Sequence, residues 1–355
     1  MLDPAASLGA PPPPTAPVCA FVVTYNRAEL LARCLDAVLA QRPVPATVLV
    51  IDNASTDGTA ALLASRYPRV EVRRLEMNTG ASGGYRAGVE AALAHEEPWV
   101  WILDDDAAPA PDCLAELLAV ADLTGKRAVV PRRWFTDGGP DALLRDEAVV
   151  DEAAQRWAAP DEPASAEEDA ALRWVPVDVF TFEGPLVHRD AFARVGLPDA
   201  GYFISADDTD WSLRHYRAFG PGAAVLARRA VVEKHRFPLT EVPIRSALKR
   251  HITGDGTFTL WPDADHWKRA YYLRNRHLLW KRMGWRRRRW QQAAVHLGYL
   301  LVDALEARRR GWDWRLRLKA NARSLAQGIA GRGGAFLDPA AWHAARQRRA
   351  SSRPR

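Results

Sequence analysis

The chain has 355 residues, of which 48% are hydrophobic, and a formal net charge of +6. This length allows one large domain with an appendage or two modest domains, and this composition allows a sizeable buried core. The three cysteines, Cys19, Cys34 and Cys113, show no CxxC spacing, which argues against a disulfide framework or a zinc site and fits a reducing cytosol. No apolar run approaches the roughly 18 residues of a membrane-spanning helix.

Residues 1–17 are rich in proline and alanine, and we expect a disordered tail there. After them, apolar runs with β-branched residues alternate with segments of helical spacing, such as Leu31, Leu35 and Val38. Strands are predicted at residues 18–24, 48–52, 70–75 and 99–103, and helices at residues 28–41, 56–67 and 83–95. This alternation predicts an α/β fold with a mostly parallel sheet that helices cover on both faces.

A polar and acidic stretch follows at residues 137–173, and we expect it to be a helix-containing insertion or a lid. Core-like sequence resumes at residues 174–182. Helices are then predicted at residues 190–195 and 208–219, and a strand at residues 223–232, ending near His235. Residues 18–262 are therefore expected to form one domain.

From Lys268 onward the sequence predicts helices. Between Lys268 and Lys319 there are sixteen lysines and arginines against three acidic residues, which indicates an anionic partner for this part. Two apolar stripes have helical spacing: Trp290, Ala294, Leu297, Leu301 and Leu305, and then Trp314, Leu318, Ala322, Leu325 and Ile329. We expect residues 263–335 to form a basic amphipathic helical region and residues 336–355 a basic, frayed tail.

Four polar clusters stand at the ends of predicted strands. They are residues 24–27, residues 52–58, residues 78–80 with the glycines at 83 and 84, and residues 104–106. Ligands of open α/β sheets bind beyond the carboxyl ends of strands, so four such clusters in succession predict a shared crevice. Asp52 could accept a hydrogen bond from a nucleobase or ribose, whereas Asp57 and Gly58 could equally form only a turn and a helix start.

The triple aspartate at the end of the fourth strand is the most informative cluster. In extended backbone, Asp104 and Asp106 point to one side and Asp105 to the other. Two carboxylates on one side offer oxygen ligands for Mg²⁺ or Mn²⁺. The alternative is an acidic turn that caps the helix near Asp112. The apolar strand immediately before the aspartates favours the metal site.

A second acidic cluster, at residues 207–210, precedes a predicted helix. One of its aspartates could simply cap that helix, and on local grounds this is as good an interpretation as a general base that takes a proton from an acceptor hydroxyl. His235 follows a predicted strand. A lone histidine is usually structural or exposed, but as a third metal ligand it would complete an Asp/Asp/His set.

Taken together, these segments resemble the family 2 inverting glycosyltransferases of the GT-A fold. The resemblance covers approximately residues 18–235 and rests on the order and spacing of FVVTYNR, VLVIDNASTDGT, NTGASGGYRAG, WVWILDDDA, GLPDAGYFISADDTDWSLR and EKH. It implies a Rossmann-like nucleotide-sugar-binding domain, a divalent cation held by Asp104, Asp106 and His235, and Asp208 as the base, with Asp207 as the alternative. The donor-binding residues that it implies are Thr24, Asn26, Arg27, Asp52, Asn78, Gly80, Asp104 and Asp105.

Within that family, the WVWILDDD segment and the basic YYLRNR element at residues 271–276 are most similar to galactofuranosyltransferases of cell-wall galactan synthesis, and next to rhamnosyltransferases. The resemblance implies a nucleotide-sugar donor, UDP-galactofuranose or alternatively dTDP-rhamnose. It also implies a polyprenyl-diphosphate-linked or other cell-envelope glycan acceptor. Many relatives carry Glu-Asp-x-Asp where this chain has Asp-Asp-Thr-Asp, which leaves both Asp207 and Asp208 open as the base.

The arginine run at residues 286–289, flanked by Trp285 and Trp290, combines cations with aromatic residues of the kind found at membrane interfaces. It predicts attachment to an anionic membrane, with the protein peripheral on the inner, cytoplasmic face. The alternative is a solvated basic face on packed helices.

Two other functions fit parts of the sequence. A sugar nucleotidyltransferase usually has a glycine-rich first loop, which residues 24–27 lack. A nucleic-acid-binding protein would suit the basic C-terminal part, but it leaves the four strand-end clusters unexplained, so no nucleic-acid partner is expected. The sequence does not indicate an oligomeric state.

Overall fold

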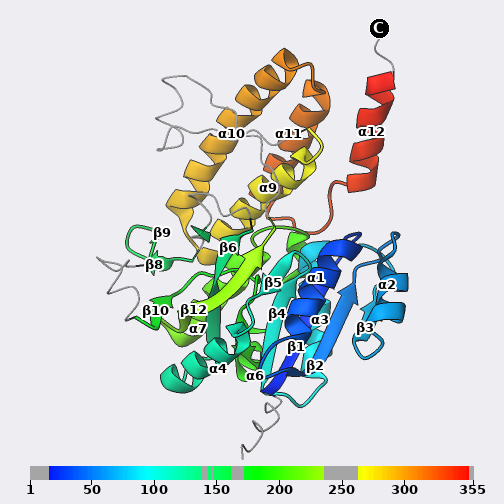
Figure 1. Cartoon of the computed structure of the whole chain (residues 1–355). Coiled ribbons are helices and arrows are strands. Elements are labelled where there is room, and N and C mark those ends of the chain that lie inside the picture. The colour runs from blue at the N-terminus through cyan, green and yellow to red at the C-terminus, as the bar shows by residue number, and fades with distance from the viewer. Residues whose placement is uncertain (1–15, 137–142, 145–146, 161–171, 236–262, 352–355) are drawn as a thin grey trace, which may run out of the picture.

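The structure is a computed structural model that describes residues 16–136, 143–144, 147–160, 172–235 and 263–351. One mixed sheet runs through the molecule in the order β10-β12-β6-β11-β4-β1-β2-β3, with β5 paired to β12 and β7 to β6 (Figure 1). Its long pairings, β2 with β1 and β3, β1 with β4, and β6 with β12, are parallel, whereas β11 runs antiparallel between β4 and β6. The α/β expectation is confirmed.

The strands of this sheet are β1 (Ala16–Thr24), β2 (Pro45–Asp52), β3 (Glu71–Arg74), β4 (Trp99–Asp104), β5 (Ala107–Pro109), β6 (Ala128–Phe135), β7 (Leu143–Leu144), β10 (Trp174–Val177), β11 (Leu186–His188) and β12 (Ala224–Lys234). The helices packed on it are α1 (Ala28–Leu39), α2 (Thr59–Arg66), α3 (Gly80–Leu93), α4 (Cys113–Thr124), α6 (Arg189–Val195) and α7 (Asp207–Phe219). A short 3-10 turn, η1 (Ala200–Tyr202), precedes α7.

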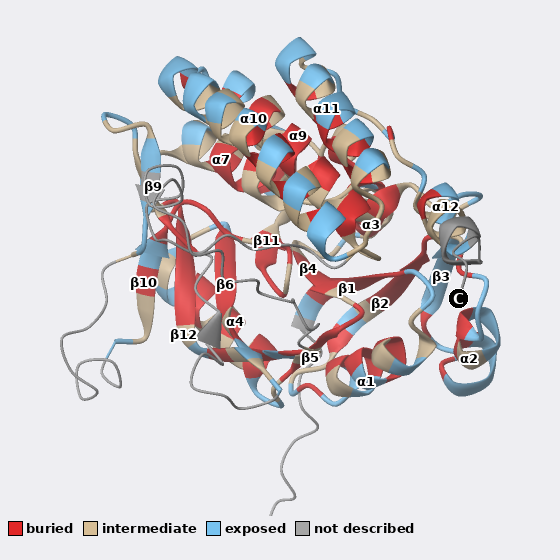
Figure 2. Ribbon diagram, turned by 90° about the horizontal axis from the view of Figure 1, so that it is seen from above, coloured by how far each residue is buried: buried red, intermediate tan, exposed pale blue. Residues whose placement is uncertain are grey.

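Alternate residues of β1 supply two separate apolar cores. Val18, Ala20 and Val22 pack with α1, α2 and α4, and the intervening Phe21 and Val23 pack with α3, α6 and α7. The two helix sets lie on opposite faces of the sheet (Figure 2). The period of two along a strand explains why β1, apolar throughout, is buried on both sides.

The expected acidic insertion lies partly outside the described residues. Its described part contains the short strands β7, β8 (Val149–Asp151) and β9 (Arg156–Ala158), and no helix. The interpretation of the whole stretch as a helix-containing insertion or a lid stays a prediction. The expected N-terminal tail lies outside the described residues, except that residues 16 and 17 already belong to β1.

The C-terminal part consists of α9 (His266–Met283), α10 (Arg286–Arg309), α11 (Trp314–Ala330) and α12 (Pro339–Ser351). Helices α9, α10 and α11 pack against one another beside the sheet (Figures 1 and 2). The last segment is a helix and not the expected frayed tail, because Trp342 is buried, stacks on His266 and donates to the Asp263 carbonyl at 3.0 Å.

The α9–α11 group buries polar side chains as well as apolar ones. Asp303 of α10 accepts hydrogen bonds from Arg317 and Asn321 of α11, and all three are fully buried. The buried rings of His277 and His296 lie with Nε2 and Nδ1 3.2 Å apart. The large apolar side chains of the predicted α10 stripe are instead 58–73% exposed: Trp290, Leu297, Leu301 and Leu305. No helix in the described part of the chain is long and apolar enough to cross a membrane.

Candidate active site

The carboxyl ends of three parallel strands meet at one edge of the sheet. Thr24 of β1 pairs with Asp52 of β2, and Val23 pairs with Asp104 of β4. Hydrogen bonds join the loops that follow, since the Asn26 N–H donates to Ser55 Oγ at 2.9 Å. The fourth cluster joins through Asn53, whose amide donates to Asn78 Oδ1 at 3.2 Å and to the Gly80 carbonyl at 2.9 Å. The four predicted clusters therefore lie together at one edge of the sheet.

The three adjacent aspartates stand at the end of β4 and in the turn that follows it. Asp105 accepts a hydrogen bond from Thr24 Oγ1 at 2.8 Å and one from Arg27 at 3.0 Å, and the same Arg27 nitrogen lies 3.4 Å from Asp106 Oδ2. Asp104 and Asp106 converge on Lys234, whose Nζ lies 3.1 Å from Asp104 Oδ2 and 3.0 Å from Asp106 Oδ1. Burial raises the pKa of Asp106 to about 6, against the opposing effect of Lys234.

Lys234 and Glu183 are site residues that the sequence reasoning missed. The Lys234 ammonium also contacts Glu183, and Glu183 pairs with the buried Arg133. Two signals point to them: Lys234 stands just before His235 at the end of a strand, and Glu183 is the first charged residue after the apolar run ending at Phe182.

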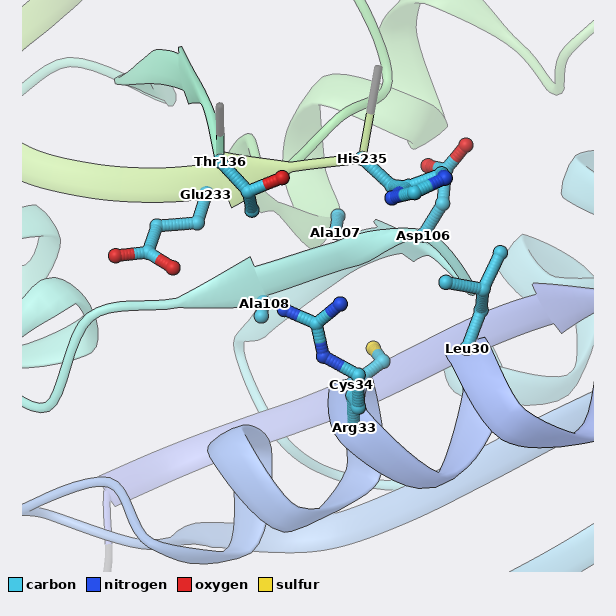
Figure 3. Close-up of a pocket in the computed structure, with 9 residues that line it drawn as sticks. All are labelled: Leu30, Arg33, Cys34, Asp106, Ala107, Ala108, Thr136, Glu233 and His235. Atoms are coloured by element: carbon cyan, nitrogen blue, oxygen red, sulfur yellow. The ribbon is translucent and has the colours of Figure 1, made fainter. Parts of the chain in front are cut away.

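His235 lies beside the Asp106 carboxylate in Figure 3, and its backbone N–H donates to the Asp106 carbonyl at 3.1 Å. It lines a cavity of about 10 Å³, room for one water, together with Glu233 and Arg33. Glu233 and His235, the two neighbours of Lys234 in the chain, both line this cavity, and Lys234 does not. This arrangement follows from the alternation of side chains along a strand. Among the described residues, no three His, Cys, Asp or Glu side chains are grouped to hold a metal ion. The Asp104, Asp106 and His235 set therefore stays a prediction.

The second acidic cluster begins α7, and its members differ. Asp207 is buried, and burial together with the neighbouring Asp208 raises its pKa well above the usual range. Asp208 is half-buried and accepts from the Thr209 N–H at 2.6 Å, and burial raises its pKa to about 6. Burial therefore raises the pKa of Asp207 more strongly than that of Asp208. Asp210 is structural, since it accepts from Tyr202, Arg214 and Arg282.

This cluster lies close to the first. The carboxylates of Asp104 and Glu183 raise the pKa values of Asp207 and Asp208 respectively, and Tyr85 of α3 donates to Asp104. The start of α3 is tied to the segment before α7. Gly80 has φ +74°, and a Cβ there would stand 2.0 Å from the Phe203 carbonyl oxygen, so only glycine fits.

The segment that leads into Asp207 has a backbone that side chains rarely adopt. Phe203, Ser205 and Ala206 all have φ between 66° and 69°. Such residues cost free energy and persist only where the surroundings hold them. Here the surroundings are α9: the buried Asn275 amide donates to the carbonyls of Tyr202, Ile204 and Ser205 at 3.0, 2.7 and 2.8 Å.

Arg274 completes this clamp. Its buried guanidinium donates to the Tyr202 carbonyl at 2.8 Å and to the Gly201 carbonyl at 3.2 Å, and its Nε donates to Asn275 Oδ1 at 2.8 Å. The basic YYLRNR element thus holds the loop of the second acidic cluster, a role that sequence spacing did not indicate.

The predicted donor-binding residues lie together at this edge. Asp52 is buried and accepts from Arg74 at 3.0 Å and from the Ser55 N–H at 2.8 Å, and Asn78 accepts from the Gly80 N–H at 2.8 Å. Thr24 and Arg27 are both engaged by Asp105. Their contacts with a donor remain predictions.

Comparisons with known proteins agree with this geometry. Residues 19–182 match the domain described as glycosyl transferase family 2. The chain is 30% identical over 285 residues to galactofuranosyltransferase GlfT1 of Mycolicibacterium smegmatis, covering 76% of this chain and 88% of that protein. It is 30% identical over 245 residues to N-acetylglucosaminyl-diphospho-decaprenol L-rhamnosyltransferase of Mycobacterium tuberculosis, covering 59% and 75%.

A solved structure, GalNAc-T7 with UDP, GalNAc and Mn²⁺, shares the fold with a TM-score of 0.52 at 15% identity. The likeness covers 74% of this chain and 47% of that one, so the chain spans less than half of its length. The expected GT-A fold is confirmed. With the domain match and the coverage of GlfT1, the chain belongs to glycosyl transferase family 2 and is a glycosyltransferase.

Proposed function

We propose that this enzyme is a metal-dependent inverting transferase that moves galactofuranose from UDP-galactofuranose to a polyprenyl-diphosphate-linked or other cell-envelope glycan. The observation that carries the reaction type is the juxtaposition of two converging carboxylates, Asp104 and Asp106, with the ionised Asp208. An acceptor hydroxyl and a leaving diphosphate need these two kinds of group near one another.

The donor set fits a divalent cation. Carboxylate oxygens are the ligands that Mg²⁺ and Mn²⁺ prefer. Described charges around the aspartates are five carboxylates, of Asp104, Asp105, Asp106, Glu183 and Glu147, against the three cations Lys234, Arg27 and Arg133. This excess of negative charge repels a diphosphate, and a cation held by Asp104 and Asp106, with His235 beside them, would supply the missing neutralisation.

Asp208 acts as the base in this proposal. A carboxylate with a pKa near 6 is ionised at neutral pH and still basic enough to accept the hydroxyl proton as the sugar is transferred. The hydroxyl then attacks the anomeric carbon opposite the diphosphate, and the configuration inverts. Asp207 is the weaker candidate because it is buried, and burial and the neighbouring Asp208 raise its pKa well above the usual range.

The choice of sugar rests on GlfT1, named a galactofuranosyltransferase, of which the match covers 88%. A rhamnosyl transfer from dTDP-rhamnose is the alternative, supported by the rhamnosyltransferase of equal identity over a shorter match. The decaprenol in the name of that relative supports a lipid-linked acceptor.

The test is a donor screen. The full chain is incubated with UDP-galactofuranose, UDP-galactopyranose or dTDP-rhamnose, each with Mg²⁺, Mn²⁺ or a chelator, and binding and hydrolysis are measured. Metal-dependent turnover of UDP-galactofuranose alone is expected. Selective turnover of dTDP-rhamnose would show that the transferred sugar is rhamnose. Full activity in the presence of chelator would disprove the metal dependence.

We further propose that the protein binds the inner, cytoplasmic face of the cell membrane through α10. The sequence-based reason must be corrected: Trp285 is buried on Trp280, with ring centroids 5.3 Å apart, so it is not an interfacial residue. What supports the proposal is the outward stripe of Trp290, Leu297, Leu301 and Leu305, with exposed arginines at both ends of the helix, Arg286, Arg287, Arg308 and Arg309.

Buried leucines contribute about 1.5–3 kcal/mol each, so four large side chains favour a membrane interface strongly. Each basic residue near an anionic surface adds about 1 kcal/mol. Flotation with phosphatidylglycerol vesicles should recover the wild-type chain but not the Leu297→Ser/Leu301→Ser variant. Leu123→Ser, at an exposed leucine of α4, is the control and should float as wild type does. Equal flotation of all three proteins would disprove the role of α10.

A further inference from the structure

Lys234 stands between the two carboxylates that the proposed metal would need. Its ammonium contacts Asp104 and Asp106 at 3.1 and 3.0 Å, and also Glu183. The Lys234 side chain is 11% exposed, so solvent screens these contacts little. Before any ligand is bound, the two aspartates thus share the Lys234 charge, and Asp106 also lies 3.4 Å from Arg27.

The backbone fixes this position. In the pairing of β12 with β5, Lys234 stands opposite Ala107, the residue after Asp106. In the pairing of β12 with β6, Val232, two residues before Lys234, stands opposite Arg133, which binds Glu183. Because side chains two apart on a strand share a face, Lys234 is directed at the aspartates and Glu183 by the sheet itself.

We propose that Lys234 is an internal competitor of the divalent cation, which must displace its ammonium from Asp104 and Asp106 before those carboxylates become ligands. This inference rests on the proposed metal-dependent function. A displaced ammonium keeps Glu183 as its partner, and a bound diphosphate offers it further oxygens.

Free metal alone therefore binds weakly, because it must break the ion pairs of the buried Lys234 ammonium, and no new partner for the ammonium arrives with it. Metal that arrives with a nucleoside diphosphate binds well, because the phosphate oxygens take up the ammonium. Lys234 thus couples the binding of the metal to the binding of the donor, so that each ligand binds more tightly when the other is present.

The experiment measures Mn²⁺ affinity of the full chain by the electron paramagnetic resonance of free Mn²⁺, at about pH 8, above the ordinary pKa range of carboxyl groups. In the absence of nucleotide, Lys234→Met should bind Mn²⁺ at least about tenfold more tightly than wild type. Lys234→Arg keeps the charge and should resemble wild type. Lys319→Met, at an exposed lysine of α11, is the matched control and should also resemble wild type.

A second readout is the factor by which UDP tightens Mn²⁺ binding. That factor should be larger in wild type than in Lys234→Met, since only wild type has an ammonium to relocate. A variant that merely unfolds would lose binding in both conditions, and circular dichroism would show it.

Three outcomes decide between the ideas. Tighter nucleotide-free binding in Lys234→Met supports the competitor. Equal or weaker binding in that folded variant, with loss of binding in Asp106→Asn, overturns the competitor and leaves the metal site standing. If no protein binds Mn²⁺ even with UDP, the metal in the proposed function fails, and the competitor fails with it.

Discussion

The sheet region and the helical region both bury apolar side chains, but they differ in where their polar and exposed apolar side chains lie. In the sheet region, apolar residues such as Leu35 of α1 are fully buried, and polar residues collect where strands end. In the α9–α11 group, charged and amide side chains such as Asp303 and Asn321 are buried, whereas Leu301 is 65% exposed. The first pattern is that of a protein domain surrounded by water, which buries apolar side chains and leaves polar ones at the surface. Exposed apolar side chains such as Leu301 are the observation on which the proposed membrane attachment of α10 rests.

The largest expected effect concerns the chemistry of the sheet region. Asp208→Asn should lower kcat by about 10²–10⁴-fold because the acceptor hydroxyl loses its base, while UDP binding, measured by calorimetry, stays unchanged. Asp207→Asn should cost much less, since Asp207 is buried and burial raises its pKa well above the usual range. If Asp207→Asn has the larger effect on initial rates, the assignment of the base is reversed.

The next effect tests the comparison with one substitution made twice. Leu35→Ala should lower the free energy of unfolding by about 3 kcal/mol, because it opens a cavity in a closed core. Leu301→Ala in α10 should change it by less than about 0.5 kcal/mol in water. Urea unfolding of both variants gives the answer. Similar losses would mean that α10 has a covered face in solution, and the contrast between the regions would break.

A third prediction tests where the two regions meet. Asn275→Leu should cost about 2 kcal/mol of stability, because the Ile204 and Ser205 carbonyls lose the Asn275 donor and the Tyr202 carbonyl loses one of its donors, and it should also lower kcat. The matched control is Asn321→Leu, which removes a buried amide that binds Asp303, away from the loop. It should lower stability similarly and leave kcat unchanged. Loss of kcat in both variants would assign Asn275 to general stability alone.

The smallest effect is a shift in pH dependence. The base must be ionised, and burial raises the pKa of Asp208 to about 6, so kcat/KM should fall as the pH drops below about 6. An unperturbed aspartate would move this fall to about pH 4. Asp106, whose pKa burial also raises to about 6, titrates in the same range, so the metal is kept saturating. A profile flat down to pH 5 would contradict the assignment.

Much of the sheet region could be predicted because its signals are local. The apolar runs of β1 and β4, and the polar residues that end them, place Thr24 and Asp104 at the same edge of the sheet. Lys234 and Glu183 were missed because only the antiparallel β11 and the register of β12 bring them to the aspartates. No spacing along the chain encodes such pairings between distant segments.

The helical region was predictable in type but not in orientation. A stripe such as Leu297, Leu301 and Leu305 predicts a helix, but the stripe alone does not indicate whether it faces the protein core or the protein surface. The orientation depends on buried partners such as Arg317 and Asp303, which lie 14 residues apart on different helices. The role of Asn275 was hidden for the same reason, because its partners are backbone carbonyls, which have no sequence signature.

The clamp from Arg274 and Asn275 also bears on how such enzymes can be cut and recombined. A fragment that ends before α9 would contain every proposed reacting carboxylate and still lack the donors that hold the left-handed residues Phe203, Ser205 and Ala206. A chimera that exchanges C-terminal halves between relatives inherits the same dependence. The composition of the chain changes near residue 262, but the part before this position does not contain everything that holds the site. The smallest catalytic unit of this chain extends into α9.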